Sequence, residues 1–144
     1  MIIIAPYAQK LRNGKENPKN YPYWKELIYK IDKSIHIIQV GVEGDVKLVD
    51  DCRFNLPIKS LKDLIAECDT WIAVDSMFQH LAWSCKKKGI VLWSQSDPKI
   101  FGHKENINLL KNKIYLRKNQ FLWWEQTDHI KEAFVSPYEV IKYL

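Results

Sequence analysis

The sequence lacks the compact motifs that mark the best-known nucleotide-binding and hydrolytic enzymes. It contains no GxGxxG or GxxxxGKS/T glycine loop, no HExxH zinc helix and no Ser/His/Asp triad. Internal repeats, linkers and low-complexity segments are also absent. His103 and Glu105 form a lone His–x–Glu pair, which is weak evidence for a metal, and we expect no metal site.

Cysteine is scarce, and no apolar run is long. Cys52, Cys68 and Cys85 are an odd number without CxxC spacing, which predicts reduced, largely buried thiols instead of a disulfide framework or a zinc site. Such thiols are typical of a cytoplasmic protein. The N-terminal stretch MIIIAPYAQK is too short for a signal peptide or a membrane span, so we expect a buried first strand there.

What is present is an ordinary globular composition with a modest excess of basic residues. The 144 residues suit one domain, and the formal net charge is +5. This charge suits a phosphorylated ligand but is too small to argue for nucleic acid. Three consecutive lysines, 86–88, fall at the end of a predicted helix, where they either complement the helix dipole or face an anion.

Apolar runs and helical periodicity alternate along the chain. We expect strands at residues 2–5, 35–41, 70–75, 90–93 and 113–117, with a candidate strand at 46–50. Helices are expected at 21–32, at 60–68 (with Ser60 and Asp63 as a near capping box), after residue 75, and at 136–144 with Ser136 as N-cap and Pro137 in the first turn. This alternation predicts an α/β fold: a single Rossmann-like domain over 1–144, with a mostly parallel sheet and helices on both faces. Residues 118–144 form a C-terminal tail and helix, whose first part reads equally as loop, helix or lid.

Several polar residues follow predicted strands and therefore meet at one edge of the sheet. Asp75 and Ser76 stand at the turn before a helix, and His80 follows one turn later. A diphosphate placed there would meet unpaired helix amides, the Ser76 hydroxyl and the imidazole. Asp75 is equally readable as an N-cap, and His80 as a surface residue.

Two further residues are expected at the same edge. Lys19 precedes the first helix, in a loop from which an ammonium can reach a phosphate, although it also reads as a solvated lysine. Glu43 follows Gly41 at the end of the second strand, where Rossmann-like sheets often hold ribose hydroxyls with a carboxylate. The segment GVEGD is also readable as a plain turn.

Taken in order, these segments resemble glycosyltransferase family nine, the ADP-heptose:lipopolysaccharide heptosyltransferase family. The resemblance runs from about Ile2 to about Asn108, and each piece alone is loose. It rests on KNYPYWKELI, on GVEGD after a strand, on SLKDLIAECD, on VDSMFQHLA and on SQSDP. It implies the C-terminal half of a GT-B fold, which binds the nucleotide part of a sugar donor, for hexosyl or heptosyl transfer without a metal or other cofactor.

The resemblance also implies roles for residues. Lys19 would contact the diphosphate, Glu43 the ribose, and Asp75 and Ser76 the phosphates, with His80 beside them. Met77 would lie in the nucleotide site in place of the family's glycine, which lets a phosphate approach the backbone closely. Three residues are expected just behind these contacts: Ser94 (also in place of a glycine), Ser96 and Asp97. The family's usual histidine after the first strand is missing.

A GT-B enzyme carries its acceptor site, and usually its catalytic carboxylate, on another domain, so we expect a protein partner or a second copy to supply the acceptor side. The segment FLWWEQ (121–126) is a candidate docking face, and it reads equally as tail packing. Three hypotheses follow: a nucleotide-sugar-binding subunit of a split glycosyltransferase, a stand-alone nucleotide-binding module, and an interaction protein that kept only the fold.

Overall fold

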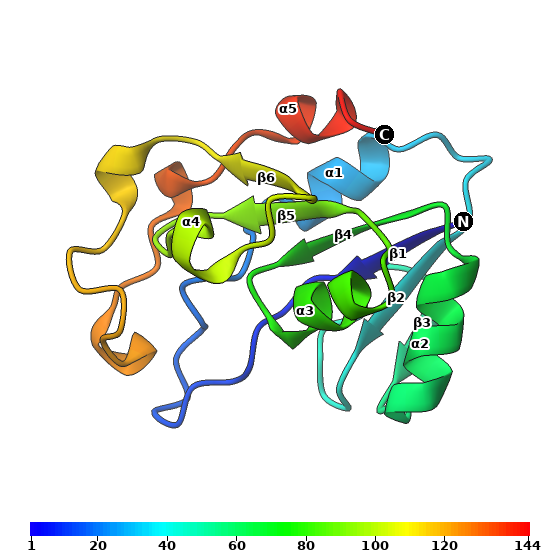
Figure 1. The fold of residues 1–144 in the computed structure, drawn as a ribbon, viewed down its shortest axis with the longest axis horizontal. Helices are drawn as coiled ribbons and strands as arrows, with labels where there is room; N and C mark the ends of the chain where they lie inside the picture. The colour runs from blue at the N-terminus through cyan, green and yellow to red at the C-terminus, as the bar shows by residue number, and fades with distance from the viewer.

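Six parallel strands form one sheet at the centre of the molecule (Figure 1). The computed structural model describes all residues, 1–144. The strands are β1 (Ile2–Ala5), β2 (Ile37–Gly41), β3 (Asp51–Phe54), β4 (Thr70–Val74), β5 (Ile90–Trp93) and β6 (Ile107–Leu110). Their order is β3-β2-β1-β4-β5-β6, and every neighbouring pair is parallel. This is the strand order of a Rossmann fold, so the predicted fold class is confirmed.

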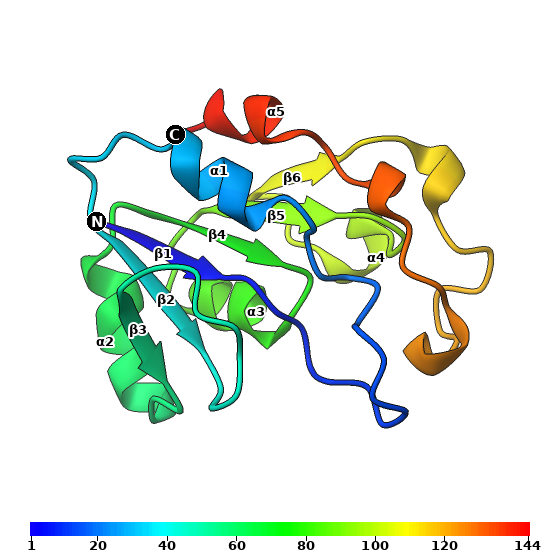
Figure 2. The same ribbon diagram turned by 180° about the vertical axis from the view of Figure 1, so that it is seen from behind.

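Helices cover both faces of the sheet because its central strands are apolar on both sides. Figure 1 shows α2 (Ile58–Glu67) and α3 (Met77–Ser84) in front of the sheet, and Figure 2 shows α1 (Trp24–Lys30) and α5 (Pro137–Ile141) on the opposite face. Alternate residues of the central strands β1, β4 and β5 pack into two separate cores of 14 buried residues each. In β1, for example, Ile4 enters the core under α1 and Ile3 the core under α2.

Two strand predictions were wrong. The third strand is Asp51–Phe54. Residues 46–50 are irregular because the buried Gln39 side chain forms hydrogen bonds with their backbone groups. Its Nε2 donates to the Val46 carbonyl at 2.9 Å, and its Oε1 accepts from the Leu48 amide at 2.8 Å. These bonds replace the ladder bonds of a strand.

The last strand, β6, lies at Ile107–Leu110, earlier than the predicted 113–117. Lys113–Tyr115 is instead a 3-10 turn, and the Asn112 side chain caps it by accepting from the Ile114 amide. Local side-chain capping of this kind competes with strand formation.

The predicted helices exist, but their caps differ from those expected. Helix α2 begins at Ile58 after Pro57, so Ser60 and Asp63 form no capping box. Helix α5 begins at Pro137 after Ser136, as predicted, although the Ser136 hydroxyl makes no capping bond. Among the lysines at 86–88, the Lys87 ammonium donates to the Cys68 carbonyl at 2.7 Å, so it caps the end of α2 and not that of α3, the helix that the lysines follow.

The cysteines are free thiols, as predicted, but only Cys68 is fully buried, and Cys52 and Cys85 are half-buried. The tail passes through two 3-10 turns, Trp124–Gln126 and Lys131–Ala133, before α5. None of the helices combines the length and apolar character that a membrane span requires.

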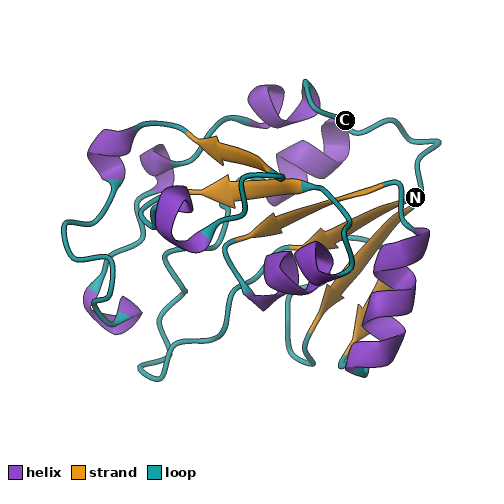
Figure 3. Cartoon of the chain, viewed as in Figure 1, coloured by secondary structure: helices purple, strands orange, loops and turns teal.

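The loops that position the candidate site gather at the carboxyl ends of the strands (Figure 3). They are the long β1–α1 connection (residues 6–23), the turn after β2, the short β4–α3 turn and the loop from β5 into α4 (Pro98–Phe101). The segment around Trp124 lies beside the β1–α1 connection: the Arg12 side chain contacts Glu125. Parallel α/β sheets bind ligands at this edge.

Candidate functional site

A cleft of about 1120 Å³ opens at the carboxyl ends of the strands. Its walls come from the β1–α1 connection, the ends of β1 and β2, the starts of α2 and α3, and the tail segment 122–125. Five of the predicted site residues line it: Lys19, Asp75, Ser76, Met77 and His80. The structure thus brings together residues that the sequence placed at one edge of the sheet.

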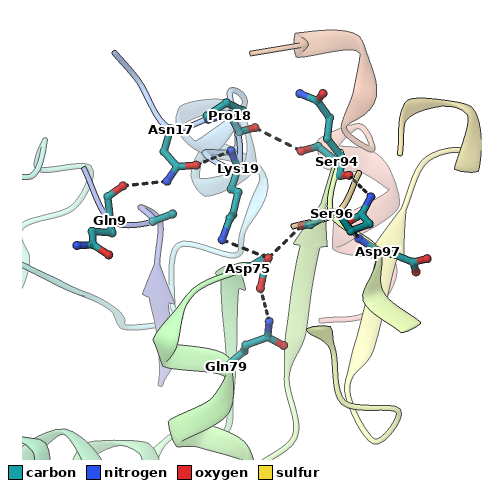
Figure 4. A network of polar contacts seen from close by, with 12 residues as sticks. Gln9, Asn17, Pro18, Lys19, Asp75, Gln79, Ser94, Ser96 and Asp97 are labelled. Atoms are coloured by element: carbon teal, nitrogen blue, oxygen red, sulfur yellow. Dashed lines mark hydrogen bonds and ion pairs between the residues drawn. The ribbon is translucent and has the colours of Figure 1, made fainter. Parts of the chain in front are cut away.

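Asp75 is the hub of a buried polar network (Figure 4). Its Oδ1 accepts from the Gln79 Nε2 at 2.7 Å, and its Oδ2 accepts from the Ser96 hydroxyl at 3.0 Å. The same Oδ2 lies 3.4 Å from the Lys19 ammonium. Asp75 is therefore not the N-cap of α3; its carboxylate holds three side chains from three different segments.

Lys19 is positioned by several contacts besides this ion pair. Its backbone amide donates to the Asn17 side chain at 3.0 Å, and Asn17 in turn donates to the Gln9 carbonyl at 2.8 Å (Figure 4). The Ser94 hydroxyl holds the preceding backbone by donating to the Pro18 carbonyl at 3.3 Å. The ammonium also lies 5.1 Å from the centre of the Trp124 ring, a favourable cation–π distance. An ammonium has three N–H donors, so the single contact with Asp75 leaves donors for a ligand.

The start of α3 contributes unpaired amides to the same cleft. Ser76 is its N-cap residue in an extended conformation, and its side chain makes no capping hydrogen bond. The amides of the first turn have no intrahelical acceptor and carry the positive end of the helix dipole. Met77 follows at the cleft wall with 58% of its surface exposed, so it borders the opening without being packed into it.

His80 is paired with another imidazole. Its Nδ1 lies 2.8 Å from the Nε2 of His103, whose ring stacks on Trp83 with a centroid separation of 4.5 Å. Burial, followed by the proximity of His103, lowers the pKa of His80 below its ordinary value, while Asp75 acts in the opposite direction. The neutral imidazole is therefore favoured at the cleft.

A match to a known protein family covers part of this site. The family model of glycosyltransferase family 9 (heptosyltransferase) matches residues 52–128, just over half of the chain. The chain belongs to this family. It matches no curated protein and no solved structure. Within the matched residues of this family 9 chain lie Asp75 with its partners Gln79 and Ser96, the start of α3 and the tail segment with its two tryptophans, whereas Lys19 lies outside them.

Four predicted site residues of the family 9 chain do not line the cleft. Glu43 is exposed in the turn after β2, where its amide donates to the Asn55 side chain at 3.2 Å. Ser94 and Ser96 are buried and support Lys19 and Asp75 respectively, as described above. Asp97 caps α4 by accepting from the Lys99 amide at 2.9 Å.

Sequence reasoning missed three contributors to the site. In the sequence, nothing distinguishes Gln79 from an ordinary polar residue on a helix surface. In the structure it is fully buried and donates to Asp75, and its own Oε1 has no partner. Arg12 and Glu125 pair at 3.2 Å across 113 residues of sequence, which no local pattern signals. No group of three or more His, Cys, Asp or Glu side chains has the proximity that a metal ion needs.

Proposed function

We propose that this family 9 chain is the domain that binds the nucleoside diphosphate part of a nucleotide sugar in a heptosyltransferase-type glycosyltransferase. One observation carries the proposal. The Lys19 ammonium is fixed in the same cleft as the uncapped N-terminus of α3. An ammonium and unpaired helix amides together form a strong site for a phosphate group.

The same groups suit the chemistry of glycosyl transfer. When the bond between the sugar and the diphosphate breaks, negative charge develops on the departing nucleoside diphosphate. Lys19 and the α3 amides are oriented before the reaction, so they would stabilise that charge with little reorganisation. Asp75 is then a positioning residue: it holds the ammonium, and Gln79 and Ser96 hold Asp75.

We further propose that transfer needs a second domain or subunit to supply the acceptor side, in a GT-B arrangement. Each carboxylate that lines the cleft is already engaged within this chain. Asp75 holds Lys19, Asp45 accepts from the Val42 amide at 2.9 Å, and Glu125 accepts from Arg12. None of the three therefore stands unpartnered over the cleft, which supports a catalytic base supplied from elsewhere.

An apolar margin around the cleft supports such docking by a protein partner or a second copy of the chain. Four large side chains that line the cleft stand largely exposed: Val42, Ile58, Met77 and Trp123. Exposed apolar residues gathered in one place are typical of interaction surfaces. The engaged carboxylates equally support a second candidate, a nucleotide-binding or protein-interaction module without catalytic activity.

Isothermal titration of the purified chain with ADP, UDP, GDP, CDP and dTDP tests the proposal. We expect saturable binding of at least one diphosphate and a loss of about tenfold or more in Lys19→Ala, because a charge-assisted contact contributes ~1.5–3 kcal/mol. Lys15→Ala is the matched control: Lys15 is an exposed lysine of the same connection that does not line the cleft. Absence of binding by every diphosphate would favour the interaction module.

A further inference from the structure

The tail and the β1–α1 connection are joined at the mouth of the cleft. The Arg12 amide and Nε both donate to the Glu125 carboxylate, at 3.3 and 3.2 Å, and the Asn13 side chain donates to the Glu125 carbonyl at 3.4 Å. The Arg12 guanidinium lies over the Trp123 ring, 4.4 Å from its centre. The Arg12 guanidinium therefore covers one face of the Trp123 indole and orients the ring, although the residue stands in an irregular segment.

The two neighbouring tryptophans of this segment have different surroundings. Trp124, which also lines the cleft, is half-buried: the Arg117 guanidinium lies 3.4 Å from its ring centre and the Lys19 ammonium 5.1 Å. Trp123 has 64% of its surface exposed and lines the cleft. Contacts within the protein therefore cover much of the Trp124 ring but leave most of the Trp123 surface available to a ligand.

Strand order indicates which part of a ligand would reach Trp123. Lys19 and the start of α3 lie over the centre of the sheet, at the ends of β1 and β4. The ends of β2 and β3 lie on one side of the β1–α1 connection and the tail segment lies on the other, as Figures 1 and 2 agree. Rossmann-like sheets hold the ribose of a nucleotide near the end of the second strand. With the nucleoside there and the diphosphate at the centre, the glycosyl group would extend toward the tail.

We propose that Trp123, oriented by Arg12, forms the subsite for the sugar ring of the donor. This inference rests on the proposed function and adds to it the residue that recognises the glycosyl group. The indole face that Arg12 leaves uncovered would pack against the apolar C–H face of a sugar ring. Arg12 stacks on the opposite face and is held by Glu125, so it acts as a positioning residue.

Paired titrations test this subsite. Each diphosphate is compared with its sugar conjugate: ADP with ADP-glucose, UDP with UDP-glucose and GDP with GDP-mannose. We expect at least one conjugate to bind more tightly than its diphosphate, by roughly three- to tenfold, and Trp123→Ala to abolish that difference while keeping the affinity for the diphosphate. Trp123→Phe should retain part of the difference.

Phe121→Ala is the matched control, because Phe121 is an exposed aromatic residue of the same segment that does not line the cleft. It should leave the difference unchanged. Three results would overturn the sugar subsite alone. In the first, Trp123→Ala keeps the difference in affinity between conjugate and diphosphate; in the second, it loses affinity for both equally. In the third, the unmodified chain binds conjugate and diphosphate with the same affinity. Absence of binding by any diphosphate would refute the proposed function and the subsite together.

Discussion

Replacing Asp75 by asparagine should destabilise the domain through Lys19. The substitution keeps the size of the side chain but removes the negative charge that faces the ammonium at 3.4 Å. The Lys19 side chain is only 20% exposed and that of Asp75 only 8%, so water cannot fully take over the lost interaction. The hydrogen bonds from Gln79 and Ser96 are also weakened, because they lose an ionised acceptor.

The magnitude follows from these contacts. Removing one partner of a buried ion pair typically costs ~3–5 kcal/mol, and the long contact and the remaining exposure of Lys19 reduce this to roughly 2–3 kcal/mol. In a domain of this size, such a loss lowers Tm by about 5–10 °C. Urea denaturation followed by circular dichroism measures the change in the free energy of unfolding, and the slope shows whether unfolding stays two-state.

A double-mutant cycle makes the reasoning refutable. Lys19→Met should rescue much of the stability lost in Asp75→Asn, with a coupling energy of about 1–2 kcal/mol. Asp128→Asn is the control, since its exposed side chain makes no hydrogen bond, and it should change stability by less than about 0.5 kcal/mol. If the effects of the Lys19 and Asp75 substitutions add within about 0.5 kcal/mol, Asp75 does not hold Lys19.

Three other predictions concern packing, docking of the tail and pH. Gly89→Ala should cost ~1–3 kcal/mol or more in unfolding free energy, because the new Cβ would lie 2.2 Å from the buried Trp71 indole; a wild-type urea midpoint would contradict this. Tyr21→Phe should cost about 1 kcal/mol by removing a buried hydroxyl that donates to a tail carbonyl at 2.9 Å, whereas the exposed Tyr29→Phe should be neutral in the same assay. The lowered pKa of His80 means that the unfolded chain binds more protons, so stability should fall as pH drops below about 6.5, and less steeply in His80→Gln; equal slopes for the two proteins would refute this.

The sheet was predictable because its central strands are continuous apolar runs in the sequence. Helices cover both faces of these strands, and turn residues bound each apolar run: Ile2–Ala5, Thr70–Val74 and Ile90–Trp93. The edge strands were misplaced because local hydrogen bonds decide where they lie. The Gln39 side chain makes hydrogen bonds with the backbone of the strand predicted at 46–50. The Asn112 side chain caps a 3-10 turn where the strand at 113–117 was predicted.

The sequence predicted which edge of the sheet holds the site and several of its residues, but not which side chains those residues contact. Parallel strands end at the same edge, so the sequence placed Lys19, Asp75 and His80 together. It could not show that Asp75 holds side chains instead of capping α3, because Ser96 and Lys19 come from distant segments. The pairing of Arg12 with the tail depends on tertiary packing in the same way.

The most direct test of the account is an amide-resolved NMR titration of the labelled chain with the diphosphate that binds in calorimetry, or with the whole panel if none does. The account predicts that the largest shifts fall on Ser76, Met77 and Phe78 at the start of α3 and on the backbone around Lys19, since these groups would meet the phosphates. Shifts confined to the groove between β6 and α5, or no shifts at all, would contradict the assignment of the cleft as a nucleotide site.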